Sequence, residues 1–159
     1  IISRNTIRFV LVFIVAVVLL AVVRTGGNFS LPNILSGNAQ AQVNDKTINL
    51  IVAKSDKDRM KGLSGRNNLP EDQGMLFIFE KKGKYGFWMR DMKFPLDIIY
   101  IDDSTVVYLV ENAPAGAQAP NLTVYAPDTD VNRVLELNAG GTKKYGIKKG
   151  TKINFKGAD

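Results

Sequence analysis

The chain has 159 residues, of which 21 are lysine or arginine and 15 are aspartate or glutamate, giving a formal charge of +6. It contains neither cysteine nor histidine, which excludes disulfides, thiolate zinc sites and catalytic arrangements that depend on a histidine base. Without Arg4, Arg8 and Arg24, 18 basic residues face 15 acidic ones, so the rest of the chain is only mildly basic. We expect no cofactor and no metal site.

An uninterrupted apolar run with arginines on both sides occupies residues 9–23. A membrane-spanning helix usually needs about 20 residues, whereas the apolar core of a secretory signal takes about 7 to 15. The A-x-A motif of Ala39 and Ala41 lies far from this run, which favours an uncleaved anchor whose flanking arginines extend the helix. The sequence therefore predicts a membrane anchor or signal segment over residues 1–24.

The charge around the apolar run sets the expected orientation. Arg4 and Arg8 precede the run and Arg24 follows it, so the positive-inside rule places the N-terminus in the cytoplasm. Residues 25–41 are rich in Gly, Asn and Ser, which is typical of a flexible tether. We expect a single-pass protein of the cytoplasmic membrane whose globular domain, residues 42–159, is extracytoplasmic, or secreted if the N-terminal segment is cleaved.

Short runs of β-branched and other apolar residues dominate the remaining sequence. Residues 55–58 resemble a capping box, and Gly62 can end a helix after two turns. Strands are predicted over residues 46–53, 74–79, 97–101, 105–110, 133–138 and 152–155, with a further short one at 87–89. The pattern predicts a β-dominated α+β fold: a mostly antiparallel, closed or nearly closed sheet with one or two short helices, preceded by the N-terminal apolar helix.

Several motifs of this domain occur in the order known from one protein family. They are Arg59-Met60-Lys61-Gly62-Leu63, Gly74-Met75-Leu76-Phe77-Ile78-Phe79, Phe87-Trp88-Met89, Phe94-Pro95-Leu96-Asp97-Ile98-Ile99-Tyr100-Ile101-Asp102, Val134-Leu135-Glu136-Leu137 and Gly146-Ile147-Lys148-Lys149-Gly150. Together they resemble the domain of unknown function family 192, also called uncharacterised protein family 0127, over most of residues 44–156. The resemblance implies an exported or anchored β-rich domain without an established reaction. Thr151 departs from the family, in which an Asp commonly follows the last Gly.

Aromatic and thioether side chains cluster in the sequence around Trp88. Trp88 and Met89 stand beside Phe87, Met92 and Phe94, and such surface suits an apolar or sugar-ring ligand. The alternative is an ordinary core, because a small β-rich domain needs large side chains to fill its interior. We include Trp88 and Met89 among the candidate pocket residues.

Two carboxylates and an arginine complete the candidate pocket. Asp97 begins an apolar strand, where it can cap a turn or pair with Arg59 or Arg66. Glu136 alternates with leucines, so it faces either solvent or the inside of a closed sheet. If Asp97 and Glu136 met in one cleft, they could act as the acid and the base or nucleophile of a glycosidase-like site. The candidate pocket therefore comprises Arg59, Trp88, Met89, Asp97 and Glu136.

Basic residues gather near the C-terminus, among them Lys143, Lys144, Lys148 and Lys149. They can meet lipid headgroups or an anionic envelope polymer, or form an ordinary solvated surface. Paired aspartates in the predicted turns suit turn formation better than Ca²⁺ binding. No nucleic-acid-binding module is recognisable, so we expect no nucleic-acid partner.

The sequence leaves three classes of function open. Export, the aromatic cluster and the missing histidine and cysteine favour a binding or accessory module at the cell envelope. The alternative is a carboxylate-dependent hydrolase acting on an envelope glycan, so whether the domain is an enzyme stays open. The third class is a structural partner in a membrane complex.

Overall fold

The computed structural model describes residues 39–116 and 122–158. The predicted membrane segment, residues 1–24, lies outside the described residues, and so does the predicted tether up to residue 38. Within the described ranges, no helix is both long enough and apolar enough to cross a membrane.

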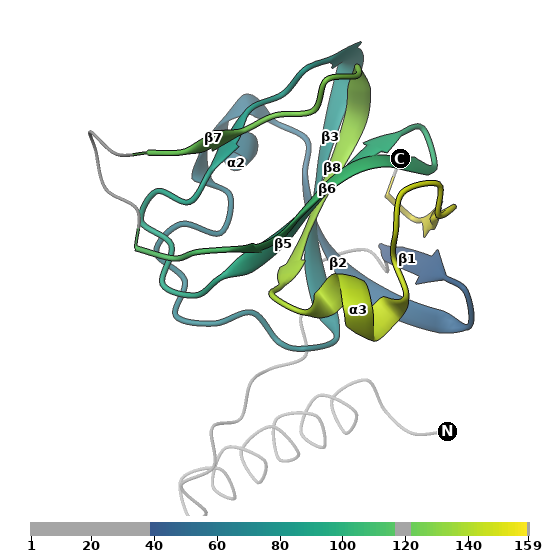
Figure 1. Cartoon of the computed structure of the whole chain (residues 1–159), viewed down its shortest axis with the longest axis horizontal. Helices are drawn as coiled ribbons and strands as arrows, with labels where there is room; N and C mark the ends of the chain where they lie inside the picture. The colour runs from purple at the N-terminus through teal and green to yellow at the C-terminus, as the bar shows by residue number, and fades with distance from the viewer. Residues whose placement is uncertain (1–38, 117–121, 159) are drawn as a thin grey trace, which may run out of the picture. The chain divides into compact units, whose positions relative to one another are not determined.

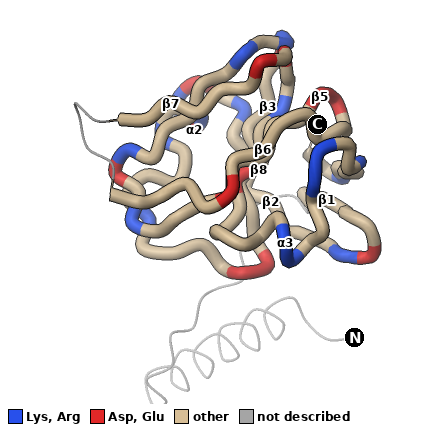
Figure 2. Tube along the Cα trace, in the orientation of Figure 1, with Lys and Arg blue, Asp and Glu red and all other residues tan. Residues whose placement is uncertain are grey.

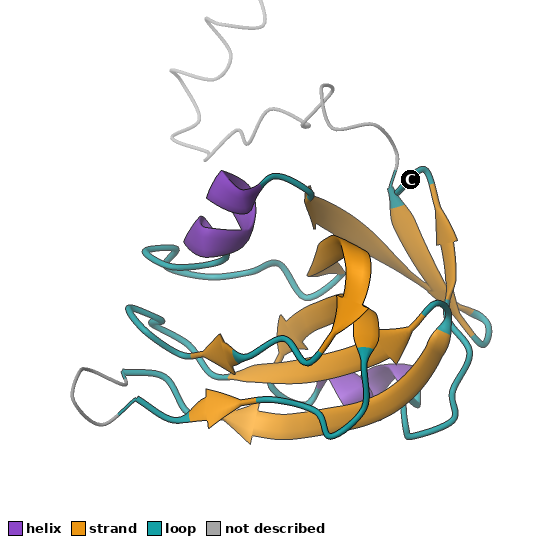
Figure 3. Ribbon diagram, turned by 90° about the horizontal axis from the view of Figure 1, so that it is seen from above, coloured by secondary structure: helices purple, strands orange, loops and turns teal. Residues whose placement is uncertain are grey.

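A seven-stranded sheet with the order β6-β5-β8-β3-β2-β1-β9 is the frame of the domain (Figure 1). Its strands are β1 (Gln40–Val43), β2 (Lys46–Ala53), β3 (Gln73–Gly83), β5 (Leu96–Asp102), β6 (Thr105–Ala113), β8 (Val131–Asn138) and β9 (Asn154–Lys156). A separate ribbon pairs β4 (Phe87–Trp88) with β7 (Val124–Tyr125). Two short helices, α2 (Asp56–Lys61) and α3 (Gly141–Tyr145), lie well apart on the curled sheet (Figure 3).

The sheet is antiparallel except where β2 runs parallel to β3. Parallel neighbours need a crossover connection, and here the crossover contains α2. The prediction of a β-dominated α+β fold with short helices is confirmed. The prediction of a closed or nearly closed sheet is wrong, because the sheet curls into a half-barrel and stays open.

The sheet stays open because its edge strands β6 and β9 do not form a ladder. The start of β6 meets the chain just before β9 at a bridge between Thr105 and Lys152. Near this bridge the amide of Val106 donates to the carbonyl of Thr151. Beyond it β9 pairs with β1 instead. A closed barrel needs a continuous ladder between its first and last strands, and this contact is too short to supply one.

Two-residue turns connect β1 to β2 and β5 to β6. Asn44 and Asp103 have φ angles of 55° and 54° in these turns, a left-handed conformation that Asn and Asp tolerate better than most residues. The strand β1 begins inside the segment that the sequence assigns to the tether. It belongs to the domain because Ala41 and Val43 bury their side chains completely in the core.

Each face of the sheet has its own apolar core. On the α3 side Leu76, Ile99 and Leu135 pack together, and on the opposite side Met75 and Ile98 belong to a second cluster. Neighbouring residues alternate between the two clusters because consecutive side chains of a strand point to opposite faces. The strand β5 is buried on both faces, which explains why its residues 98–101 form an uninterrupted apolar run. We call the face opposite α3 the pocket face.

Candidate functional site

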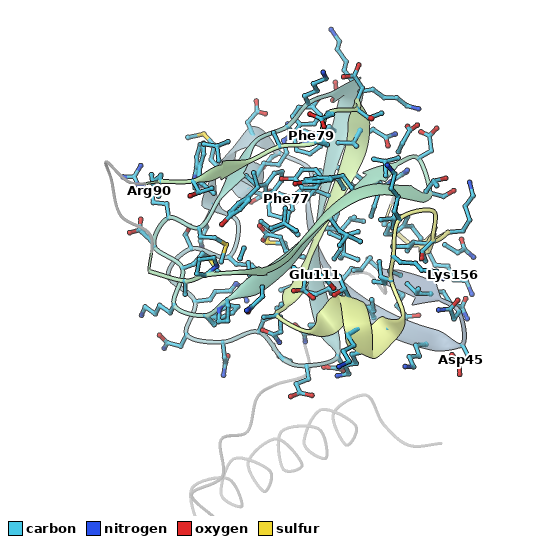
Figure 4. The ribbon with its side chains drawn as sticks, viewed as in Figure 1. Asp45, Phe77, Phe79, Arg90, Glu111 and Lys156 are labelled. Atoms are coloured by element: carbon cyan, nitrogen blue, oxygen red, sulfur yellow. The ribbon has the colours of Figure 1, made fainter. Side chains whose placement is uncertain are left out.

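The pocket face carries a pocket of about 410 Å³ lined by residues of α2, β3 and β4. Its walls include five aromatic side chains, Phe77, Phe79, Tyr85, Phe87 and Trp88, and we call it the aromatic pocket. Its volume lies within the range of roughly 300 to 1,000 Å³ that is common for small-ligand sites. Figure 4 shows Phe77 and Phe79 on the same side of β3, toward α2.

Ring contacts fix the positions of these aromatic walls. The rings of Phe77 and Phe87 meet edge to face with centroids 4.8 Å apart, and Phe87 meets Tyr100 in the same way at 6.0 Å. Phe79 and Tyr85 are stacked, with centroids 3.6 Å apart. Aromatic pairs contribute about 0.5 to 1.5 kcal/mol each beyond the burial of their area. The pocket is therefore pre-formed by the packing of its own walls.

Arg59 of α2 lies on the pocket lining, but its donors are largely engaged within the protein. Its Nη1 donates to the carbonyl of Lys54 and, at 2.8 Å, to the carbonyl of Ile78 on β3. Its Nη2 donates to Asp56 Oδ1 at 2.5 Å. The guanidinium carbon lies 5.2 Å from the ring centroid of Phe79. Arg59 thus ties α2 to β3 and holds one wall of the pocket.

Glu136 is the buried carboxyl of the aromatic pocket. It comes from β8, where it lies opposite Met75 of β3 and Ile98 of β5. Its side chain lines the pocket and is only 5% exposed. Among the described residues none donates a hydrogen bond to it or forms an ion pair with it. Burial without such a partner raises the pKa of Glu136 to about 8.

Asp97, the other predicted carboxylate, does not line this pocket. In the ladder between β5 and β8, Asp97 lies opposite Leu137, whereas Glu136 lies opposite the next residue, Ile98. Leu137 belongs to the core on the α3 side and Ile98 to the core of the pocket face. The two carboxylates therefore leave the sheet on opposite faces. A glycosidase-like site needs both in one cleft, and this arrangement does not provide it.

Asp97 instead anchors α3 and the end of β6 to β5. Its Oδ1 accepts the amide of Asn112 at 2.8 Å. Its Oδ2 accepts the amide of Thr142 at 2.8 Å and the hydroxyl of Thr142 at 2.7 Å. Glu111 Oε1 lies 2.9 Å from the same hydroxyl, and Figure 4 shows Glu111 beside α3. Asp97 is fully buried, and its oxygens are satisfied by the fold itself.

The remaining predicted residues divide between pocket and core. Trp88 lines the aromatic pocket and is 51% exposed at its rim. Met89 is 2% exposed and belongs to the core of the pocket face instead of the pocket lining. Met89 follows the end of β4 and packs in this core, so its side chain is not part of the pocket lining. The structure thus brings together Arg59, Trp88 and Glu136 and separates Met89 and Asp97 from them.

Sequence reasoning missed several pocket residues, chiefly Phe77, Phe79 and Tyr85. The alternation of Phe77 and Phe79 within a predicted strand indicates that both point to one face. It does not indicate which face, nor that α2 and β4 close over it. Only the tertiary structure provides that information.

The C-terminal lysines do not form one free surface. Lys144 Nζ donates to the carbonyl of Glu71 at 2.8 Å and lies 3.3 Å from Glu71 Oε2. Lys143, Lys148 and Lys149 are exposed, and Figure 2 shows basic segments on α3 and on the chain that follows it. Their binding to an anionic polymer or to lipid headgroups stays a prediction.

Asp102, at the end of β5, and Asp103, in the turn that follows, both interact with a lysine of the protein. Lys82 Nζ lies 2.5 Å from Asp102 Oδ1 and 2.9 Å from Asp103 Oδ2. In the part of the chain that the structure describes, no three acidic or other metal-ligating side chains gather around one point.

Comparison with known proteins identifies relatives of the domain. The model of domain of unknown function family 192, described as an uncharacterized ACR, matches residues 39–155. A protein from Sinorhizobium meliloti 1021, described as a proposed transcription regulator, is 28% identical with a TM-score of 0.67, covering 75% of this chain and 92% of that one. A protein of unknown function from Novosphingobium aromaticivorans DSM 12444 is also 28% identical, with a TM-score of 0.65. The match covers 73% of this chain and 82% of that one. No curated protein matches the chain.

Proposed function

We propose that this chain, which belongs to domain of unknown function family 192, is a binding module that takes a small, largely apolar ligand into the aromatic pocket. The observation that carries this proposal is the burial of the Glu136 carboxyl group at the pocket without a hydrogen-bond donor from the described residues. It is buried at the pocket, yet no described residue donates to it.

Burial disfavours the charged form of Glu136, and because its side chain lines the pocket, a donor from a ligand can reach it there. Leucine at position 136 would continue the apolar pattern of Leu135 and Leu137 and remove this penalty. A ligand that brings a hydrogen-bond donor to the pocket satisfies Glu136 and explains why a carboxyl group stands there.

The other polar side chains of the lining are largely committed to the protein. Ser64 Oγ donates to the carbonyl of Arg90 at 3.2 Å, and the Tyr85 hydroxyl donates to the carbonyl of Lys81 at 2.6 Å. With apolar walls and one buried carboxyl, the pocket suits a ligand that is mostly apolar and carries a donor group for Glu136.

We place this binding function at the cell envelope, on the outer side of the cytoplasmic membrane. The support is the apolar run of residues 9–23 with its flanking arginines. In a bacterial host, carbonate-washed membranes should retain the full chain, and protease added to spheroplasts should digest its domain. Protection from protease in intact spheroplasts would refute this orientation.

Regulation of transcription, suggested by the description of the Sinorhizobium relative, has weaker support. The described helices α2 and α3 have six and five residues, shorter than the helices that typically enter the DNA major groove. The carboxyl of Glu136 and the apolar walls also do not suit a phosphate backbone.

Trp88 provides a direct test because it is the single tryptophan of the chain and lies at the pocket rim. Titration of the full chain with 2-phenylethanol, an apolar ring with one hydroxyl, should change its fluorescence in a saturable way. Ser64→Phe, which adds bulk to the lining, should abolish the response. Ser104→Phe, in the turn between β5 and β6, is the matched control and should leave it unchanged. Binding that survives Ser64→Phe would contradict a site in the aromatic pocket.

A further inference from the structure

We propose that the ligand of the aromatic pocket is a small organic ammonium ion, a protonated amine on an apolar chain or ring, with the Glu136 carboxylate as its counter-ion. This inference rests on the proposed binding function and specifies its ligand class. Three features carry it: the unpartnered carboxyl, the aromatic walls, and the engagement of the neighbouring cation Arg59.

Arg59 does not serve as the partner of Glu136. Its guanidinium is held by two backbone carbonyls and by Asp56, and it lies over the ring of Phe79. Lys61 also lines the pocket, but it is exposed to solvent on α2. None of the described residues therefore places a cation beside Glu136. A cationic ligand can occupy this position.

The walls suit a positive charge as well as an apolar group. The face of an aromatic ring is negative, so a cation within about 6 Å of a ring centroid is attracted to it. The protein already uses this interaction at the pocket, where the Arg59 guanidinium lies 5.2 Å from the centroid of Phe79. An ammonium head in contact with Glu136 would have the rings of Phe77 and Phe87 in the same pocket.

Other ligand classes fit less well. At a pH where Glu136 is ionised, an anionic ligand would bring a second negative charge next to this buried carboxylate. A sugar needs several hydrogen-bonding partners, whereas the side chains of Ser64 and Tyr85 donate to backbone carbonyls of the protein. An alcohol can bind through one hydroxyl, but it lacks the charge that would stabilise the carboxylate form of Glu136.

The pairing makes binding depend on pH. Burial raises the pKa of Glu136 to about 8, so in the free protein this group is mostly protonated near neutral pH. An ammonium ion binds the carboxylate, and its affinity should therefore rise with pH until the group is ionised. The other titratable groups around Glu136 are Asp56, Arg59, Lys61, Tyr85 and Tyr100. Burial raises the pKa of the Tyr100 hydroxyl, so this group stays protonated across the pH range of the test.

The test compares three probes of similar shape on the full chain by calorimetry and Trp88 fluorescence: 2-phenylethylammonium, 2-phenylethanol and phenylacetate. At pH 8.5 the ammonium ion should bind at least about tenfold more tightly than the alcohol, and phenylacetate should be the weakest. Between pH 8.5 and pH 6.5 the affinity for the ammonium ion should fall by roughly 20-fold, whereas that for the alcohol should change little.

Glu136→Gln should lower the affinity for the ammonium ion to that for the alcohol and abolish the pH dependence. Glu80→Gln, an exposed carboxylate on β3, is the matched control and should preserve both. An alcohol that binds as tightly as the ammonium ion, without pH dependence, would overturn the ligand class and leave the binding function standing. Equal binding of all probes to Ser64→Phe and to the unmodified chain would overturn the binding site itself.

Discussion

Two buried carboxyl groups on neighbouring strands have opposite surroundings in this domain. Asp97 of β5 accepts three hydrogen bonds from Asn112 and Thr142 on the α3 side of the sheet. Glu136 of β8, on the pocket face, accepts none from the described residues. Burial by itself therefore does not indicate function. The satisfied carboxylate of Asp97 holds elements together, whereas the unpartnered carboxyl of Glu136 beside the pocket is the basis of the proposed ligand site.

The largest expected effect on the free energy of unfolding comes from replacing Asp97, the carboxylate whose hydrogen bonds are satisfied. Asp97→Ala removes the acceptor of two backbone amides and one hydroxyl and leaves a cavity, so we expect the free energy of unfolding to fall by about 4 to 5 kcal/mol. Urea denaturation of the full chain measures this, with the exposed Asp45→Ala as control. A loss below about 1 kcal/mol would mean that these hydrogen bonds do not anchor α3.

Replacing Glu136 should raise the free energy of unfolding instead of lowering it, and the size of this gain should depend on pH. Its folded pKa of about 8 lies above the ordinary value of 4.5, so between these pH values the unfolded chain releases a proton that the folded chain keeps. Stability should therefore fall as pH rises through this window. Glu136→Gln removes the titration and should gain up to about 4 kcal/mol at pH 8.5 but almost nothing at pH 4.

Urea denaturation at the two pH values tests this prediction, and Glu80→Gln serves as the exposed control. An equal gain at both pH values would show that packing, and not ionisation, limits the stability at position 136.

A smaller loss of stability is expected from a change at Thr142. Its hydroxyl donates to Asp97 Oδ2 and lies 2.9 Å from Glu111 Oε1. Thr142→Val keeps the shape of the side chain and the backbone amide but removes the hydroxyl. We expect a loss of about 1 to 2 kcal/mol in the free energy of unfolding. Thr47→Val, exposed on β2, is the control. No loss beyond that of the control would show that the backbone donors alone satisfy Asp97.

The smallest effect on stability is expected at the pocket rim. Trp88 is half exposed, so Trp88→Ala should change the free energy of unfolding by less than about 1 kcal/mol. The affinity for 2-phenylethylammonium measured by calorimetry should nevertheless fall at least about tenfold, because the substitution removes a wall of the pocket. Tyr108→Ala, an exposed aromatic residue outside the pocket, should preserve binding. A loss of stability without a loss of affinity would show that Trp88 stabilises the fold and does not contribute to ligand binding.

The candidate pocket was partly predictable from the residue types. Of the five candidate residues, Arg59, Trp88 and Glu136 line the aromatic pocket. Met89 does not, because it is buried in the core of the pocket face, and Asp97 does not, because its side chain points to the α3 face. Periodicity assigns residues to one face or the other, but it does not identify which face carries the pocket.

The sequence by itself determined the family, the β-dominated character and most strand positions, because β-branched runs and turn residues are local signals. It did not determine that the sheet stays open, since this depends on whether two distant edges pair. It also could not distinguish Asp97 from Glu136, two acids within apolar strands. Their difference comes from α3 and the end of β6, which bring hydrogen-bond donors to one face, and from α2 and β4, which leave a cavity on the other.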